Sequence, residues 1–531
     1  MRMEITNEAL LAQRVNVGDI SRRGARRHPR KTSVIMGERR LSYRELDDLS
    51  NQVANGLLAL GLGAGSRISV LGRNSIEFLL LYFGAAKAGA ILCPANPALP
   101  ESDLQYVLNH AEVNAIFVDK SEIGRIAALL PQIPTARHLF MLSTDSTLEW
   151  KTLHDLASGQ LKTDPNVLVG DRDVAMIMYT SGTTSAPKGA MLSHLNVTVG
   201  AMHNAFAGEM TEDTIATAIL PLFHCGQLSL TSGTLVRGGT VVIMDGFNPY
   251  LLLQSIGKDR ITWMFALPAM YRTLLAHPGL DDANLSSLQF CLYAMAPMDH
   301  ATLRQAITRL GVRFALTSGQ TEAYPPTVVF SSEYQLLKEG PFWGRAMPLV
   351  EMAIMDDDGT LLENGEVGEI VYRGPMLMEG YLKDPEATRK AFAGGWFHSG
   401  DLGRVDEDDM LLFVDRKKDI IKSGGENVSS IKIERCLLSH PGVTSAAVIG
   451  MPNERWGEEV IAAVCLATKS PPSQAELIAY CKATLAPFEV PKKVIIYERL
   501  PQTATGKILK FEIRKEMQKL LESLPGVSSN N

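Results

Sequence analysis

Hydrophobic and polar positions in the first part of the chain follow two periods in turn. Apolar side chains recur at helical spacing over residues 46–57, and Ser42 with Glu45 forms a capping box just ahead of them. Short apolar runs alternate with such helical segments and predict buried strands. These strands are expected at residues 67–71, 90–93 and 115–118. Strands and helices in regular alternation predict an α/β fold with a largely parallel sheet and helices on its faces.

The end of the chain has a different pattern, which predicts a second and smaller unit. Three strand-like runs occur there, at residues 444–449, 460–466 and 494–497, and one helical segment lies at residues 474–485. A unit of about a hundred residues is large enough to fold as a domain. We therefore expect a large N-terminal domain of βαβ layers with parallel-rich sheets, residues 1–414, and a small α+β C-terminal domain, residues 415–531.

Length, charge and cysteine usage narrow the class of protein. A chain of 531 residues is too long for one compact core, and 46% hydrophobic with 21% charged residues is ordinary for a globular protein. The formal net charge of −6 argues against a nucleic-acid partner. The longest apolar run, residues 78–86, is too short to cross a bilayer, so we expect no integral membrane segment. The six cysteines are scattered without a C-x-x-C pair, which favours a reduced, cytoplasmic protein.

The strongest local signal is the stretch VAMIMYTSGTTSAPKGAMLSH at residues 174–194. A buried strand is predicted at residues 174–179, and a turn rich in hydroxyl groups follows it. Backbone N–H groups in such a turn converge on an anion, and Lys188 supplies a cation for phosphate oxygens. The loop is not a Walker A motif, because Pro187 stands where that motif has glycine. We predict that this loop binds phosphate, and the alternative is an ordinary polar turn. The predicted phosphate-binding residues are Thr180, Ser181, Gly182, Thr183, Thr184 and Lys188.

This loop resembles the signature YTSGTTGxPKG of the adenylate-forming superfamily, although Ser185 replaces its third glycine. That superfamily includes acyl-CoA synthetases, luciferases and peptide-synthetase adenylation domains. Further resemblances follow in the family's order from about residue 42 to residue 514. The resemblance implies a mobile C-terminal domain that rotates about a hinge between two half-reactions, adenylation and thioester formation.

Two more segments resemble the part of the family's site that holds adenine and metal. In SGQTEA, residues 318–323, Glu322 would ligate Mg²⁺ between ATP phosphates and Thr321 would donate to the α-phosphate. Ser318 stands where the family usually has an aromatic residue that stacks on adenine. The segment AMAP, residues 294–297, resembles the family's G-x-A-P turn. The resemblance assigns nucleotide contacts to Ala296, Pro297, Ser318, Gly319, Gln320 and Thr321.

The C-terminal motifs supply the ribose contacts, the catalytic lysine and the hinge that the resemblance implies. Asp401 in GWFHSGDLG and Arg416 would bind the ribose. Lys507 in PQTATGKILKFEIR would stabilise the charge that develops on the carboxylate and the α-phosphate. The hinge is expected at Asp415. The CoA side of the site is expected at Lys422, Gly424 and Gly425.

The acyl pocket is expected around PLFHCG, residues 221–226, which resembles the family segment whose aromatic residue and histidine border the acyl group. His224 is expected to form a wall or a gate and not to transfer protons. Gly319 corresponds to a position where acetate-specific members have tryptophan, so we expect the pocket to continue past it. The pocket lining is expected from Phe223, His224, Met295 and Gly319. Such a pocket favours an acid with an extended apolar body.

The residues and the resemblance together predict an acid–CoA ligase that forms acyl-CoA, AMP and pyrophosphate through an acyl-adenylate. Lys507, Thr321 and Glu322 are the expected catalytic residues. Mg²⁺ is expected with ATP, and CoA is the expected co-substrate. The expected acid is a medium- or long-chain fatty acid, with an aryl or alicyclic acid as the alternative. The oligomeric state stays open, with a homodimer as one option.

Three other functions compete with this prediction. One is an adenylating enzyme that loads a carrier protein, but amino-acid-activating members have aspartate where His224 stands, and only 24 residues follow Lys507. A luciferase-like oxygenase fits less well, because nothing in the sequence demands oxygen chemistry. A nucleotide-binding protein without catalysis would not need Lys507, Glu322 and Asp401 together.

Overall fold

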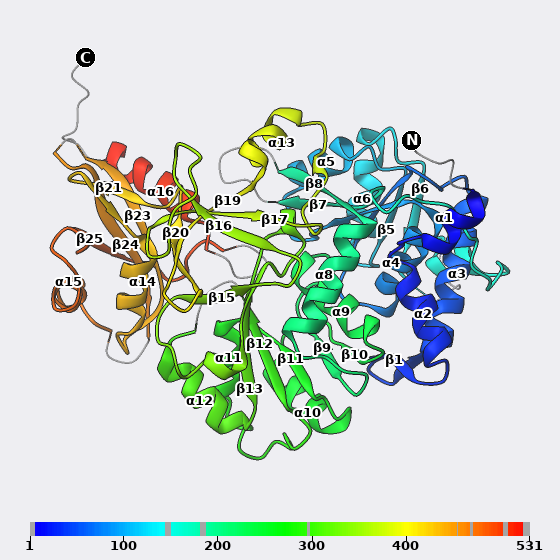
Figure 1. Ribbon diagram of the computed structural model, residues 1–531, viewed down its shortest axis with the longest axis horizontal. Helices are drawn as coiled ribbons and strands as arrows, with labels where there is room; N and C mark the ends of the chain where they lie inside the picture. The colour runs from blue at the N-terminus through cyan, green and yellow to red at the C-terminus, as the bar shows by residue number, and fades with distance from the viewer. Residues whose placement is uncertain are drawn as a thin grey trace. The chain divides into compact units, whose positions relative to one another are not determined.

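The computed structural model describes residues 6–143, 150–180, 187–294, 298–453, 455–467, 471–502 and 508–523, and side chains up to residue 519. The chain divides into two compact units (Figure 1). The first comprises Met1–Gly182, Ala186–Glu351 and Tyr372–Phe397, and the second comprises Thr183–Ser185, Met352–Val371 and His398–Asn531. The second unit therefore begins upstream of Asp415, and the domain boundary between residues 414 and 415 stays a prediction.

One sheet of the first unit contains the strands expected near the N-terminus. Its strands are β3 (Arg67–Leu71), β4 (Ile91–Ala95), β5 (Ala115–Val118), β6 (His138–Met141), β7 (Val174–Thr180), β8 (Lys188–Ser193) and β18 (Gly380–Tyr381). Their order is β18-β8-β7-β4-β3-β5-β6. The pairs among β3 to β7 are parallel, whereas β8 runs antiparallel to both β7 and β18. The predicted strands are confirmed, and two of them, β3 and β5, have the predicted bounds.

The other sheet of the first unit is also parallel at its centre. Its strands are β1 (Thr32–Met36), β2 (Arg39–Ser42), β9 (Ile215–Ala218), β10 (Thr240–Ile243), β11 (Trp263–Phe265), β12 (Phe290–Ala294), β13 (Arg313–Ser318), β14 (Val328–Phe330) and β15 (Phe342–Ala346). Within the unit their order is β15-β14-β13-β12-β11-β9-β10-β1-β2. The antiparallel pairs among the described strands lie at the two ends, with β14 and β15 on one side and β2 on the other. The parallel-rich α/β architecture predicted for the large N-terminal part is confirmed.

The helices of the first unit begin and end at local signals in the sequence. They are α1 (Asn7–Gln13), α2 (Asp19–Arg27), α3 (Tyr43–Ala59), α4 (Ile76–Ala88), α5 (Glu101–His110), α6 (Ile123–Leu129), α7 (Leu153–Ala157), α8 (His194–Ala207), α9 (Cys225–Val236), α10 (Pro249–Lys258), α11 (Pro268–Leu275), α12 (His300–Leu310) and α13 (Pro385–Ala391). Short 3-10 helices are η1 (Leu130–Gln132), η2 (Thr321–Ala323), η3 (Ser332–Tyr334) and η4 (Ala393–Gly395). The capping box of Ser42 and Glu45 is present at the start of α3. Helices α8 and α9 pack against each other (Figure 1).

The apolar run at residues 78–86 lies in α4, a helix that is buried on all sides. Even Lys87 is only 1% exposed, and its Nζ donates to Asp47 Oδ1 at 2.5 Å and to Asn51 Oδ1 at 2.6 Å on α3. Burial lowers the pKa of Lys87, and the Asp47 carboxylate opposes that effect. The run is therefore the core of an α/β layer. Across the part of the chain that the structure describes, no helix is both long and apolar enough to cross a membrane.

The second unit contains two groups of paired strands. One group has the order β16 (Glu351–Met355), β17 (Gly368–Arg373), β19 (Phe397–Val405) and β20 (Leu411–Arg416). The other is a five-stranded sheet of β22 (Glu426–Val428), β21 (Ile421–Ser423), β24 (Gly457–Leu466), β23 (Val443–Asn453) and β25 (Lys493–Ile496), the last of which pairs with β24. Its helices are α14 (Ser430–Leu438), α15 (Gln474–Lys482) and α16 (Lys510–Ser523).

Alternate residues of β23 belong to two separate cores. Ala446 and Val448 lie in the core that α14 and α15 cover, whereas Ala447 and Ile449 lie in the core that α16 covers. Side chains of a strand point to opposite faces in turn, so this sheet has helices on both of its faces. The small α+β unit predicted from the C-terminal pattern is confirmed.

Candidate active site

The predicted metal ligand Glu322 lies in η2, directly after β13. Its carboxylate Oε1 accepts a hydrogen bond of 3.0 Å from the hydroxyl of Tyr381 in β18. Its backbone oxygen accepts a second bond of 2.7 Å from the N–H of Met378. The segment that leads into β18 therefore holds both the main chain and the side chain of Glu322.

Lys188 and Thr180 close the predicted phosphate loop as a cross-strand pair. Thr180 ends β7 and Lys188 begins β8, and the two residues are register partners in the antiparallel ladder. The Nζ of Lys188 lies 5.1 Å from the ring centroid of Tyr381. A cation at that distance over an aromatic face is attracted to it. The loop residues Ser181, Gly182, Thr183 and Thr184 lie outside the described residues.

Tyr381 therefore touches two predicted site residues at once. It is half-buried, and burial together with the Glu322 carboxylate raises its pKa well above the usual value for tyrosine. Its hydroxyl is thus protonated at physiological pH and donates to the carboxylate. Tyr381 is not predicted from the sequence, because nothing in its spacing distinguishes it from a core tyrosine.

Thr321 and the segment 223–226 meet at the start of α9. The Thr321 Oγ1 lies 3.4 Å from the Sγ of Cys225, the first residue of that helix. Burial raises the pKa of the Cys225 thiol to about 11, so at neutral pH it is not a thiolate nucleophile. His224 is the N-cap residue, and its Nδ1 accepts from the N–H of Gly226 at 3.2 Å. This nitrogen is therefore engaged in the fold, which suits a wall residue better than a proton carrier.

The surroundings of Gly319 correct one expectation. A Cβ atom at this position would lie 2.8 Å from the Pro325 Cβ and 3.3 Å from the backbone nitrogen of Thr327. Contacts that short are not tolerated without movement. The expectation that the pocket continues past Gly319 in the direction of a side chain is wrong, because Pro325 fills that space. Gly319 itself is nevertheless exposed.

Neighbouring residues of the same segment are held in different ways. Ser318 is buried at the end of β13, and its backbone oxygen accepts from the Thr327 N–H at 2.9 Å. The side-chain nitrogen of Gln320 is buried and has no hydrogen-bond partner among the residues that the structure describes. Buried donors are usually satisfied, so this amide is available to a ligand. Phe223 is partly buried. Met295, Ala296 and Pro297 lie outside the described residues.

The two predicted ribose-binding residues are brought together within the second unit. Asp401 in β19 and Arg416 in β20 are register partners of an antiparallel pair. The Arg416 Nε lies 3.8 Å from the Asp401 Oδ1. A carboxylate and a guanidinium so placed present an acceptor and several donors side by side. Lys507, the predicted catalytic lysine, lies outside the described residues.

The predicted hinge residue Asp415 is fully buried and caps a helix. Its Oδ2 accepts from the N–H of Ser430 at 2.6 Å and from the N–H of Ile431 at 3.3 Å, at the start of α14. A negative charge at that end of a helix is stabilised by the free N–H groups. The Ser430 Oγ in turn lies 2.6 Å from the Nζ of Lys510, which also pairs with Glu434 at 2.7 Å.

The predicted CoA-side residues lie in β21 and in the turn between β21 and β22. Lys422 is exposed and is the register partner of Asn427. Gly424 and Gly425 have φ values of +63° and +87°, which favour glycine. A Cβ at Gly425 would meet nothing within 4 Å, so the backbone there is open to a ligand.

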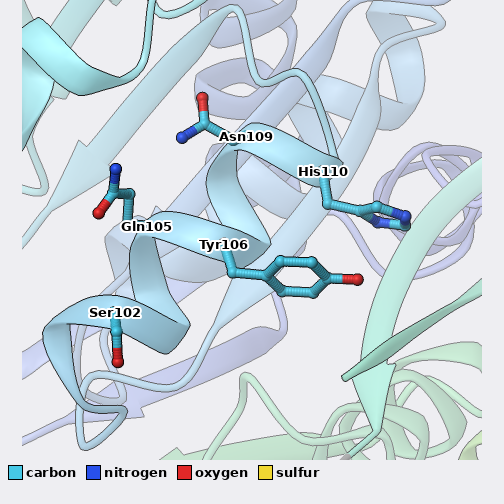
Figure 2. A pocket seen from close by; sticks show the side chains of 5 residues that line it. All are labelled: Ser102, Gln105, Tyr106, Asn109 and His110. Carbon is cyan, nitrogen blue, oxygen red and sulfur yellow. The ribbon is translucent and has the colours of Figure 1, made fainter. Parts of the chain in front are cut away.

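A pocket of about 500 Å³ lies elsewhere, along helix α5. Figure 2 shows its lining side chains, which come from Ser102, Gln105, Tyr106, Asn109 and His110. The His110 Nδ1 lies 2.8 Å from the Tyr179 hydroxyl, and burial lowers the pKa of this histidine. The lining contains no carboxylate, lysine or arginine and none of the predicted site residues. It is therefore not the candidate adenylation site.

Comparisons with known proteins agree with the order of these motifs. Residues 21–382 match the family described as AMP-binding enzyme, and residues 432–507 match the AMP-binding enzyme C-terminal domain. The chain is similar to a feruloyl-CoA synthase of Amycolatopsis sp, with 36% identity over 93% of this chain and 97% of that protein. It is also similar to the long-chain-fatty-acid–CoA ligase FadD13 of Mycobacterium tuberculosis, with 33% identity over 94% of this chain and 98% of that protein. The ATP-bound structure of MatB from Rhodopseudomonas palustris superposes with a TM-score of 0.87 and 29% identity, over 95% of this chain and 99% of that one.

Proposed function

Because this chain belongs to the AMP-binding enzyme family, we propose that it activates a carboxylic acid with ATP and transfers the acyl group to CoA. The observation that carries the proposal is the contact of Tyr381 with both Glu322 and Lys188 beside the ends of the phosphate loop. Through this contact, a carboxylate that can bind a hard cation lies near an ammonium group that can bind phosphate oxygens. Those are the two charges that an ATP triphosphate with its metal requires.

The donor set fits a magnesium ion that arrives with ATP. In the ranges that the structure describes, no three side chains of histidine, cysteine, aspartate or glutamate gather in a way that could hold a metal ion. Mg²⁺ is commonly bound through one or two protein carboxylates together with substrate phosphates and water. Glu322 would hold it, and the ion would supply positive charge between the phosphates.

The chain's own residues would then divide the work of adenylation. Lys188 and the loop between Thr180 and Lys188 would bind the phosphates, and Asp401 with Arg416 would hold the ribose. The acid's carboxylate would attack the α-phosphorus, so that pyrophosphate leaves and an acyl-adenylate forms. Lys507 would stabilise the negative charge that develops in this step.

We expect Glu322→Gln to raise the Mg²⁺ concentration needed for adenylation. Glutamine keeps the shape of the side chain but removes the charge that a hard cation prefers. The measurement is the rate of pyrophosphate release as a function of Mg²⁺ at saturating ATP and acid. Glu386→Gln is the matched control, since Glu386 is an exposed residue of α13 that pairs with Lys390 at 3.1 Å. An unchanged Mg²⁺ titration in the Glu322 variant would contradict the proposed role.

For the acid, we propose a medium- or long-chain fatty acid. The exposed Gly319 and the partly buried Phe223 support an apolar site, and the segments 221–226 and 318–323 contain no lysine or arginine that could hold a second carboxylate. The similarity to a long-chain-fatty-acid–CoA ligase supports the same class. The second candidate is an aryl acid, which Pro325 favours because it fills the space beside Gly319 and shortens the site. The similarity to a feruloyl-CoA synthase supports this second candidate.

The acid class is tested by kcat/KM over acetate, butyrate, octanoate, laurate, benzoate and ferulate. With a fatty acid as substrate, kcat/KM should climb about fourfold per methylene until the pocket is full, because each buried methylene contributes about 0.8 kcal/mol. Pro325→Ala removes ring atoms beside Gly319, so in this variant kcat/KM should continue to rise up to longer acids than in the wild type. Pro249→Ala, at the first turn of α10, serves as control. A higher kcat/KM for acetate than for the longer acids would contradict the proposed apolar pocket. A higher kcat/KM for ferulate than for laurate would favour an aryl acid as the substrate.

Coupled release of AMP and pyrophosphate tests the reaction itself. A ligase should release pyrophosphate when acid and ATP are present, whereas AMP should be released only when CoA is added, and acyl-CoA should then form in an amount equal to AMP. Replacing CoA with a carrier protein tests the carrier-loading alternative. Nucleotide binding without any pyrophosphate release over the acid panel would contradict the proposed activity.

A further inference from the structure

We infer that Tyr381 is a positioning residue that keeps the Glu322 carboxylate and the Lys188 ammonium close together but unpaired, ready for ATP and its metal. The inference rests on the proposed function, because the roles of Glu322 and Lys188 belong to it. It adds a residue that the family resemblance did not point to. It also assigns different tasks to the hydroxyl and to the ring of that residue.

The backbone of Tyr381 is fixed from two sides. In the β18–β8 ladder Tyr381 is the register partner of Ala190, two residues after Lys188. The N–H of Leu382 donates to the backbone oxygen of Gly189 at 2.8 Å. The N–H of Tyr381 itself donates to the Thr388 Oγ1 at 2.9 Å. The ring therefore starts from a main chain that is tied to the strand of Lys188.

The side chain of Tyr381 meets the two charged groups with different parts of its surface. The hydroxyl, at the end of the ring, donates to Glu322 Oε1 at 3.0 Å. The face of the ring lies under the ammonium of Lys188, with 5.1 Å from Nζ to the centroid. A hydrogen bond to a carboxylate orients it, and an aromatic face attracts a cation without neutralising it.

The consequence is a carboxylate and an ammonium that do not form an ion pair. Within the described part of the chain, no contact of 4.0 Å or less joins the Lys188 Nζ to a carboxylate. A direct Lys188–Glu322 pair would have to break before the metal and the phosphates could bind, and breaking it would weaken binding. Tyr381 gives each group another partner, so both charges stay available to the ligand.

The hydroxyl is what distinguishes this role from simple packing. A tyrosine that only filled space beside β8 would be replaced by phenylalanine without loss. Here the hydroxyl donates to the proposed metal ligand, and the backbone of Glu322 is held by Met378, three residues before Tyr381. The segment 378–381 thus sets the position of Glu322 through both its main chain and its side chain.

The test separates hydroxyl from ring with Tyr381→Phe and Tyr381→Leu. The probe is α,β-methylene-ATP, which cannot release pyrophosphate, and its affinity is measured by calorimetry with and without Mg²⁺. For Tyr381→Phe we expect unchanged affinity without Mg²⁺ and a gain from Mg²⁺ that is smaller by about tenfold, as for loss of a charge-assisted hydrogen bond. For Tyr381→Leu we expect a further loss of about two- to fivefold without Mg²⁺, because the cation–π contact is gone.

Kinetics provide a second measurement. In both variants the KM for ATP should rise at limiting Mg²⁺, whereas formation of the thioester from supplied acyl-adenylate and CoA should keep its rate. The matched control is Tyr334→Phe, because Tyr334 also lies under a cation, with the Arg345 Cζ 5.7 Å from its ring centroid, but bears no relation to Glu322. Thermal denaturation of all variants shows whether the fold is kept.

Glu322→Gln in the same titrations separates the metal role of Glu322 from the positioning role of Tyr381. If Glu322→Gln loses the gain from Mg²⁺ and Tyr381→Phe keeps it, the positioning role of Tyr381 is overturned and the role of Glu322 stands. If neither variant changes the gain, the proposed metal role of Glu322 fails and the inference fails with it. Equal losses with and without Mg²⁺ in Tyr381→Phe would mean that the residue only supports the fold, which also overturns the inference.

Discussion

Lys507→Ala should lower the rate of adenylation by about two to three orders of magnitude, as expected for loss of a group that stabilises transition-state charge. In the attack of a carboxylate on the α-phosphorus, two anionic groups approach each other and negative charge builds up on the α-phosphate oxygens, so an ammonium between them lowers the barrier. The rotation that the family resemblance implies would remove Lys507 from the site before CoA attacks. The variant should therefore convert supplied acyl-adenylate and CoA to the thioester at nearly the wild-type rate.

The measurement compares pyrophosphate release with thioester formation from purified acyl-adenylate, for wild type and variant. Lys515→Ala is the control, since Lys515 is an exposed lysine of α16 on the same C-terminal segment. It should leave both half-reactions unchanged. An equal loss in the two half-reactions of Lys507→Ala would show that the lysine does not act in adenylation alone.

Asp415→Pro should spare one half-reaction and slow the other by about a hundredfold or more, because a misplaced catalytic group costs at least that much. Proline fixes φ near its own value and so blocks the backbone change that a rotation about this residue requires. The substitution has a second effect, because the Asp415 carboxylate caps α14 through Ser430 and Ile431. Loss of such a cap costs about 0.5–2 kcal/mol of stability.

Asp415→Ala separates the hinge from the cap. It removes the carboxylate but leaves φ free, so it should lower the unfolding temperature without changing the ratio of the two half-reaction rates. Only the proline variant should change that ratio. If the alanine and proline variants have the same ratio as the wild type, the hinge lies elsewhere and Asp415 serves only to cap α14.

Local signals along the chain were enough to predict part of its strands and helices. The strands β3 and β5 have the predicted bounds, and the helix α3 begins at the predicted capping box of Ser42 and Glu45. Such features depend on the alternation of apolar residues and on hydrogen bonds between residues three apart, which neighbouring residues determine by themselves. The predicted phosphate loop, the glycines of the turn at Gly424 and Gly425, and the predicted ribose residues Asp401 and Arg416 each lie in a short continuous motif, and the roles assigned to them stay predictions.

Only the tertiary structure decided how residues far apart in the chain share a task. Glu322 and Tyr381 are separated by 59 positions and meet at 3.0 Å, where the N–H of Met378, just ahead of β18, also donates to the Glu322 backbone oxygen. Pro325 fills the space beside Gly319, which the lack of a side chain on this glycine had suggested was open. Asp415 caps a helix that begins 15 residues later. In each case the partner is chosen by the packing of strands and helices, and no spacing along the sequence carries that information.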